Sequence, residues 1–342
     1  MTKHATELQE IAQKMVADGK GILAADESSG TIKKRFDSIG TESSEQNRRD
    51  YREFLFRTTQ AMKDNISGVI LFDETLRQNA ADGTPLSQII TDAGAIPGIK
   101  VDTGAKPLAG SPGETVTEGL DGLRERFAEY HKLGARFAKW RAVITIGDNI
   151  PTQNCINANA HALARYAALA QEAGIVPIVE PEVIMDGDHD IDRCFEVTSA
   201  ALIALFNALK EQKIMLQGVI LKPNMVLSGT TCPTQADDAE IAEKTIRCFK
   251  ENVPAAVPGI VFLSGGQSDI QATARLSTMN VTKDLPWKLS FSYGRALQAA
   301  PLKAWRGKRD NVEAAQKAFA HRARMNGLAA LGNWNSSLET SA

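Results

Sequence analysis

The sequence predicts an α/β fold in which eight parallel strands, each followed by a helix, close into a single-domain (β/α)8 or TIM barrel. Short apolar segments rich in Ile and Val recur eight times, and longer segments with helical spacing of apolar residues separate them. Successive strands start roughly 30 to 45 residues apart, which leaves room for a crossover helix. Near-continuous apolar strands are typical of a parallel sheet that helices cover.

The strands are predicted by strand length, β-branched content and an apolar run that ends in a polar residue. The first four, in chain order, span residues 21–26, 68–73, 96–102 and 136–143. The second four span residues 175–182, 218–224, 259–266 and 287–294. Their spacing indicates eight consecutive β/α units.

The clearest helices between these strands are predicted at residues 119–133, 157–172, 191–210 and 239–251, where apolar residues recur along one face. Residues 41–50 and 103–118 are expected to be long loops. We expect one domain, the barrel at residues 1–331, followed by a polar tail at 332–342. An open doubly wound sheet is the alternative, but no G-x-G-x-x-G follows an early strand.

Charge and composition exclude several classes of protein. The 342 residues are 43% hydrophobic and 23% charged, as in ordinary globular proteins. Lys plus Arg number 39 against 41 for Asp plus Glu, so no overall field favours nucleic acid or a membrane surface. The first ten residues are polar, and no later segment is apolar enough to span a membrane, so we expect a cytoplasmic protein. The four cysteines are far apart and are expected to be reduced thiols.

Polar side chains gather where the predicted strands end. Residues two apart on a strand point to the same face, and the strand ends of a β/α barrel converge on one mouth. We therefore expect one charged cluster there. Its predicted members, in strand order, are Asp26, Asp73, Lys100, Asp102, Lys139, Arg141, Glu180, Glu182, Lys222, Ser264, Ser292 and Arg295.

Several lysines beside carboxylates predict covalent catalysis on a carbonyl compound. A neutral lysine forms a Schiff base, whose iminium withdraws electrons and stabilises a carbanion at the neighbouring carbon. Lys100, Lys139 and Lys222 are all eligible nucleophiles on this reasoning, and carboxylates such as Glu180 and Asp26 would transfer protons. The five histidines are scattered, so we predict no metal and no other cofactor.

Glycine-rich turns after the last two predicted strands indicate a phosphorylated substrate. They contain Ser264-Gly265-Gly266 and Ser292-Tyr293-Gly294-Arg295, each at the start of a predicted helix. Glycines admit close approach, and helix N-termini bind anions. We expect a second phosphate on the opposite side of the barrel, beside Arg35 and residues 28–31.

Seven segments resemble class I fructose-1,6-bisphosphate aldolases, over roughly residues 8 to 330. They include Phe137-Ala-Lys-Trp-Arg141, Val179-Glu-Pro-Glu182, Leu221-Lys-Pro-Asn-Met225 and Phe262-Leu-Ser-Gly-Gly266. The resemblance implies reversible cleavage of fructose 1,6-bisphosphate to dihydroxyacetone phosphate and glyceraldehyde 3-phosphate. It also implies a homotetramer that binds sugar phosphates.

The resemblance also implies residue roles. Lys222 would carry the Schiff base, Glu180 would be the principal acid/base, and Asp26 would support cleavage, with Lys139 and Glu182 assisting. Lys100 would shape the mouth. Ser264, Gly265, Gly266, Ser292, Gly294 and Arg295 would bind one phosphate, and Arg35 and Arg48 would approach the other.

Two departures from the family pattern stand out. Many relatives end in a mobile tail with a terminal tyrosine, whereas the last tyrosine here is Tyr293, and Thr103 stands where relatives have lysine. Two other functions stay open at this point: a different Schiff-base enzyme such as a transaldolase or a deoxyribose-phosphate aldolase, or a non-catalytic scaffold on the same fold.

Overall fold

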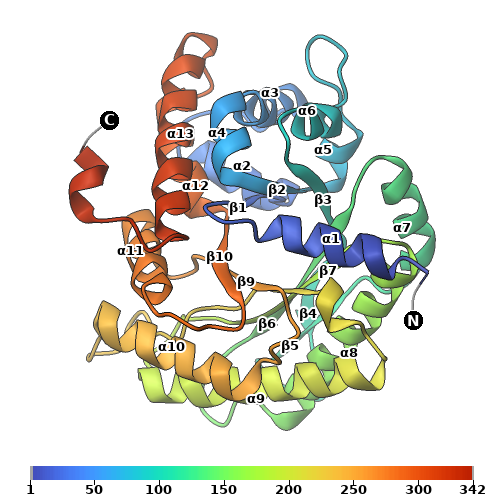
Figure 1. The fold of residues 1–342 in the computed structure, drawn as a ribbon, viewed down its shortest axis with the longest axis vertical. Coiled ribbons are helices and arrows are strands. Elements are labelled where there is room, and N and C mark those ends of the chain that lie inside the picture. Colours follow the sequence, from blue (N-terminus) through green and yellow to red (C-terminus); the bar gives the residue numbers. More distant parts are fainter. Residues whose placement is uncertain (1–2, 341–342) are drawn as a thin grey trace.

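Eight parallel strands close into a barrel in the computed structural model, which describes residues 3–340 (Figure 1). Neighbouring strands are hydrogen-bonded in the order β1-β10-β9-β8-β7-β6-β3-β2. The predicted barrel is confirmed. Its strands are β1 (Gly21–Ala25), β2 (Ile66–Leu71), β3 (Ile96–Lys100), β6 (Phe137–Ile144), β7 (Val176–Val183), β8 (Ile220–Leu221), β9 (Gly259–Phe262) and β10 (Lys288–Tyr293).

Helices surround the barrel (Figure 1). In the first half of the chain they are α1 (Ala5–Met15), α2 (Ser29–Asp37), α3 (Glu45–Phe56), α4 (Thr59–Asn65), α5 (Asp73–Arg77), α6 (Leu86–Asp92), α7 (Leu123–Lys132) and α8 (Gln153–Glu172). In the second half they are α9 (Ile191–Glu211), α10 (Asp238–Asn252), α11 (Asp269–Asn280), α12 (Arg295–Trp305) and α13 (Val312–Ala329). Single 3-10 turns lie at η1 (Leu216–Gly218), η2 (Arg309–Asn311) and η3 (Ser336–Thr340).

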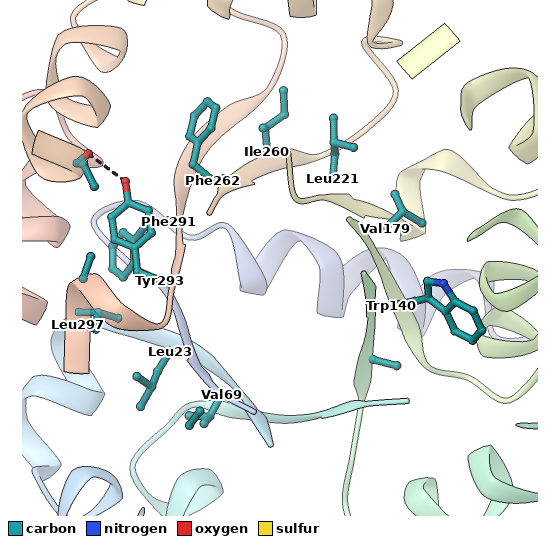
Figure 2. Packing of buried hydrophobic residues seen from close by; sticks show 14 of the residues in the cluster. Leu23, Val69, Trp140, Val179, Leu221, Ile260, Phe262, Phe291, Tyr293 and Leu297 are labelled. Atoms are coloured by element: carbon teal, nitrogen blue, oxygen red, sulfur yellow. Dashed lines mark hydrogen bonds between the residues drawn. The ribbon is translucent and has the colours of Figure 1, made fainter. Parts of the chain in front are cut away.

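The strands alternate between two buried layers because successive side chains point to opposite faces. One set packs outward against the helices; Figure 2 shows several of its members, such as Leu23, Trp140, Val179 and Phe291. In the same layer, the hydroxyl of Tyr293 donates to the carbonyl of Ala272 on α11 at 2.9 Å (Figure 2).

The other set points into the barrel and forms a smaller apolar cluster. Ile22, Ile70, Phe137 and Ile220 belong to it, together with apolar side chains of α1. Figure 1 shows α1 lying across the barrel. The N-terminal helix therefore closes one end of the barrel with apolar contacts, and the polar residues further along the same strands lie toward the other end.

Strand β8 is shorter than the predicted strand at residues 218–224. The amide of Lys222 still donates to the Val179 carbonyl at 2.9 Å. Pro223 follows and has no N–H to continue the ladder. Lys222 is therefore held by the last hydrogen bond of a strand, where its backbone position is well defined.

Two segments predicted to be loops contain regular structure. Residues 41–50 include the start of α3, where the Ser44 side chain accepts from the Asn47 amide at 3.2 Å as an N-cap. Residues 103–118 form an antiparallel hairpin of β4 (Gly104–Pro107) and β5 (Thr115–Glu118). The loop predictions were wrong because both segments are polar. In residues 41–50 the polar sequence includes a helix N-cap, and in residues 103–118 it forms a short, exposed pair of strands.

The predicted polar tail at residues 332–342 folds back onto α13 over its described part. Glu339 accepts from Arg322 at 2.6 Å, from the Trp334 indole at 3.0 Å, and lies 3.1 Å from His321. Ser341 and Ala342, like Met1 and Thr2 at the start of the predicted domain, lie outside the described residues.

Within residues 3–340, no helix combines the length and apolar character needed to cross a membrane.

Candidate active site

A cavity of about 1000 Å³ opens where the strands end. Its lining comes from several strand ends, which the barrel closure brings to one mouth. Predicted residues that line it are Asp26, Arg35, Asp73, Lys100, Asp102, Lys139, Arg141, Glu182, Lys222, Ser264, Gly265, Ser292, Gly294 and Arg295. The predicted cluster of charges at the mouth therefore forms.

Four of these charges meet in a buried chain at the floor of the cavity. Lys139 Nζ lies 2.7 Å from Asp26 Oδ2 and 3.4 Å from Glu180 Oε2. Lys222 Nζ lies 3.1 Å from the other oxygen, Glu180 Oε1. Glu180 is thus shared by two lysines, although it does not itself line the cavity.

The side chains of this group of four charges are almost completely buried, so each charge needs a partner of opposite sign. Lys139, Lys222 and Glu180 are each at most 5% exposed. Unpaired charges are very costly to bury, so two lysines and two carboxylates stabilise one another here. Glu180 Oε2 nevertheless accepts no hydrogen bond from the described residues. Within the described chain, that oxygen is held only by the ion pair with Lys139, at 3.4 Å.

The pKa values of Asp26 and Lys139 move apart. Burial alone would raise the pKa of Asp26, but the charges of Lys139, Lys222 and Lys100 outweigh burial and hold that pKa below its usual range. Burial would lower the pKa of Lys139, but Asp26, Glu180 and Asp102 together raise it above its ordinary value. Asp26 therefore stays ionised and Lys139 stays protonated near neutral pH.

Two further ion pairs lie on the side of the mouth formed by β3, β6 and β7. Lys100 Nζ lies 2.6 Å from Asp102 Oδ1, and Arg141 pairs with Glu182. The Arg141 side chain is 41% exposed, unlike the buried lysines of the floor. This wall offers cations that a ligand can reach.

The opposite wall is built by the loops after β9 and β10. Ser264, Gly265, Ser292, Gly294 and Arg295 line it. The Ser292 hydroxyl is buried and has no hydrogen-bond partner among the described residues. Gly294 and Arg295 stand at the N-terminus of α12, where backbone amides and the helix dipole favour an anion.

Arg35 lies on this same wall, which corrects the expectation that it stands on the opposite side. β1 pairs directly with β10, because the first and last strands become neighbours when a barrel closes. A Cβ added at Gly294 would lie only 3.6 Å from Arg35 Nη2. The segment after β1 therefore belongs beside the α12 N-terminus.

Two other predicted residues lie away from the cavity. Arg48 on α3 forms a bidentate pair with Glu74, at 2.6 and 2.7 Å, and does not line the mouth. Gly266 also stays outside the lining; its φ is +71°, and an added Cβ would lie 2.1 Å from Met185 Cγ. Its place in the loop is explained by backbone conformation and close packing.

Strand-end reasoning missed cavity residues that come from helices. Lys34 lies on α2, and Arg126 lies on α7, where its guanidinium donates to the carbonyls of Val101 and Gly119. The sequence carries no strand-end signal for either residue. Helical periodicity would place Arg126 on the face of α7 that also carries Leu123 and Tyr130, both buried.

No histidine of the described chain lines the cavity, and within residues 3–340 no three His, Cys, Asp or Glu side chains are grouped as metal ligands would be. In the Asp186 to Asp190 stretch, Asp190 caps α9 by accepting from the Arg193 amide at 2.8 Å.

The family model for glycolytic class I fructose-bisphosphate aldolase matches residues 7–342. The chain belongs to this family. A Xylella fastidiosa protein named as a probable fructose-bisphosphate aldolase class 1 is 62% identical over 329 residues, which cover 96% of this chain and 98% of that protein. Fructose-bisphosphate aldolase C of Carassius auratus is 53% identical, with 98% and 93% covered.

Solved structures agree with the sequence relatives. A fructose-bisphosphate aldolase from Plasmodium falciparum, solved in complex with TRAP and a small-molecule inhibitor, superposes with a TM-score of 0.97 at 47% identity. The match covers 98% of this chain and 97% of that one. The resemblance drawn from the motifs is confirmed, and the chain is an enzyme of the lyase class, a class I fructose-bisphosphate aldolase by family.

Proposed function

We propose that this aldolase cleaves fructose 1,6-bisphosphate reversibly to dihydroxyacetone phosphate and glyceraldehyde 3-phosphate, through a Schiff base on Lys222. The observation that carries the proposal is the buried contact of Lys222 with Glu180, which also contacts Lys139. It places an amine, a proton carrier and a fixed cation within one short chain of groups at the floor of the cavity.

Lys222 is the best nucleophile of the three candidate lysines. Lys139 lies between two carboxylates that raise its pKa, so it keeps its proton. Lys100 pairs with Asp102 and also donates to the Asp102 carbonyl at 2.9 Å. Lys222 has one carboxylate partner, Glu180, and that carboxylate is shared with Lys139.

The carboxylates suit the proton transfers of Schiff-base chemistry. Glu180 contacts the Lys222 amine and has one oxygen without a hydrogen bond, so we assign it the proton that leaves with water when the carbinolamine dehydrates. Asp26, held ionised by Lys139, is suited to orient or deprotonate the hydroxyl beside the bond that breaks. The electron pair of that bond passes to the iminium and gives an enamine. Glu182 is placed to assist beside Arg141.

A bisphosphate fits the two cationic walls. β9 and β10 stand opposite β3 and β6 in the strand order, so the phosphate cluster around Ser264 and Arg295 faces the cluster of Lys100 and Arg141 across the cavity. A substrate with phosphates at both ends would join these walls and place its central carbons over the lysines. We therefore propose that Arg35 binds phosphate on the wall formed by Ser264 and Arg295. We assign Arg48 no substrate role.

The test is a coupled cleavage assay on the purified chain. We expect fructose 1,6-bisphosphate to be cleaved with a higher kcat/KM than fructose 1-phosphate, and activity to survive EDTA. Equal use of the two sugars would favour another Schiff-base enzyme. An inactive protein would favour a scaffold. Loss of activity in EDTA and recovery with zinc would refute the metal-free mechanism.

We further propose a homotetramer in the cytoplasm, built from one barrel domain at residues 1–331 with the segment at 332–342 attached. The family suggests the assembly, and its mass in solution would be four times 37.0 kDa. Sedimentation equilibrium checks it; a monomer at micromolar concentration would contradict the proposal.

A further inference from the structure

Glu27 follows Asp26 in the chain, but its carboxylate contacts a different set of groups. It pairs with Arg35 of α2 through Oε1 and with Arg52 of α3 through Oε2. The amide of Gln298 on α12 donates to Glu27 Oε1 at 2.8 Å. Only 4% of the Glu27 side chain is exposed. The floor chemistry assigned to Lys222, Glu180 and Asp26 makes no use of this group.

Gln298 connects the network to the rest of the mouth. Its amide nitrogen also donates to the Ala24 carbonyl of β1 at 2.7 Å. Its oxygen accepts from the Tyr51 hydroxyl and from Arg52, both at 3.1 Å. The side chain is fully buried, and both of its polar atoms are used. It therefore ties α12, β1 and α3 to one carboxylate.

The network of Glu27, Arg35 and Arg52 carries one more positive than negative charge, and the additional positive charge lies at the cavity. Glu27 supplies one negative charge against the positive charges of Arg35 and Arg52. Arg52 is 3% exposed, so it neutralises Glu27 where no ligand can reach it. Arg35 is 25% exposed and lines the cavity. Its charge is the one left for a ligand.

The network also fixes where that charge lies. Arg35 is a long side chain that loses considerable rotamer freedom when a ligand orders it. Its Nη1 is held by Glu27, while its Nη2 lies beside Gly294, next to Arg295 at the start of α12. A guanidinium held in this way can bind an anion with its remaining donors at little entropic cost.

We propose that Glu27, itself held by Arg52 and Gln298, is a positioning residue that fixes Arg35 for binding the substrate phosphate at the α12 N-terminus. This inference rests on the proposed function, because it assigns a role within the phosphate site of that same reaction. It adds a residue that lines the cavity and acts through Arg35.

The test compares Glu27→Gln with Arg35→Met, the double variant, and Glu114→Gln as a matched control. Glu114 is also a buried glutamate; its carboxylate accepts from the Thr152 amide and hydroxyl, and it lies outside the cavity lining. Steady-state kinetics with fructose 1,6-bisphosphate and 31P NMR titration with inorganic phosphate are measured for each, with thermal unfolding as a check of folding.

We expect Glu27→Gln to raise KM and the phosphate Kd about tenfold, as for loss of a charge-assisted contact, while kcat stays within about twofold. The double variant should be no weaker than Arg35→Met alone, and Glu114→Gln should match wild type. A lower KM would show that Glu27 only repels phosphate. An unchanged KM with a lower Tm, or additive effects in the double variant, would show a merely structural role.

The two proposals fail differently. A wild-type protein that does not cleave the sugar refutes the proposed function, and the phosphate titration still reports on Glu27. An active wild type in which Glu27→Gln binds phosphate normally refutes the positioning role alone.

Discussion

Lys139 is the residue on which the protonation states at the floor of the mouth depend. It contacts both Asp26 and Glu180. Burial would raise the pKa of Asp26, and the charge of Lys139 contributes most to lowering it. A carboxylate whose pKa is lowered contributes stability above its unfolded pKa of about 3.9, and loses it as pH falls through the folded pKa. A lysine whose pKa is raised contributes below about 10.4 and loses it at higher pH. Between roughly pH 5 and 9 the pair is fully ionised.

The Lys139→Met variant tests this arrangement. We expect kcat to fall by about 100-fold or more, because proton transfer loses its fixed cation. The pKa of Asp26 should rise once its nearest positive charge is gone, so the acid limb of the pH profile should move to higher pH. Lys139→Arg, which keeps the charge, should leave that limb close to wild type. An acid limb that stays in place in Lys139→Met would contradict the account.

The sequence predicted which residues lie at the floor of the mouth better than it predicted which of them contact one another. Asp26, Lys139, Glu180 and Lys222 could be found because strands switch from apolar to charged at their ends. Which lysine faces which carboxylate depends on barrel register, which one sequence does not supply. Arg126 could not be found by that rule, because it reaches the mouth from a helix.

The loop from β9 to α11 is the element whose shape sets the phosphate wall. Gly266 has a left-handed φ of +71° and packs against buried Met185. The helix that follows is fixed by a capping box between Ser268 and Gln271. The loop is thus held at both ends, and side-chain bulk at Gly266 must displace it.

We expect Gly266→Ala to raise KM for fructose 1,6-bisphosphate by about tenfold, because the donors at Ser264 and Gly265 move and one contact of about 1.4 kcal/mol is lost. Gly30→Ala on α2, where an added Cβ meets no atom within 4 Å, is the control and should match wild type. Adding Met185→Ala should restore part of the loss. A Gly266→Ala enzyme with normal KM would refute this explanation of the glycine.

The C-terminal segment is held to α13 by the carboxylate of Glu339. Burial would raise the pKa of Glu339, but Arg322 chiefly, with His321 and Trp334, lowers it. The stability this provides is present above the unfolded pKa of about 4.3 and is lost as pH falls through the lower folded pKa. Arg322 is itself 4% exposed and depends on this partner.

We expect Glu339→Gln to destabilise the protein by about 2 kcal/mol at pH 7, which lowers Tm by about 3 °C in a chain of this size. The gap from wild type should stay constant from pH 7 to 5 and narrow only below about pH 4. Glu313→Gln on α13, which breaks an ion pair exposed on both sides, should leave Tm close to wild type. Equal effects of the two variants, measured by thermal unfolding, would argue against anchoring.

Closure of the barrel decides the geometry of the whole molecule. It makes β1 and β10 neighbours and brings Arg35 beside Gly294, although the two lie 259 positions apart in sequence. The eight β/α units predict closure, and closure makes the first and last strands neighbours. The prediction that Arg35 lies on the opposite wall was wrong because it did not take this adjacency into account. The hairpin of β4 and β5 could not be predicted in this way, because it belongs to no repeat unit.

The same closure places the three candidate lysines around one cavity, so the central claim is that Lys222 alone becomes covalent. Borohydride reduction in the presence of dihydroxyacetone phosphate, followed by peptide mass mapping, measures this directly. We predict one stable adduct, on Lys222, and none in Lys222→Met. An adduct on Lys100 or Lys139, or an undiminished adduct in Lys222→Met, would contradict the account.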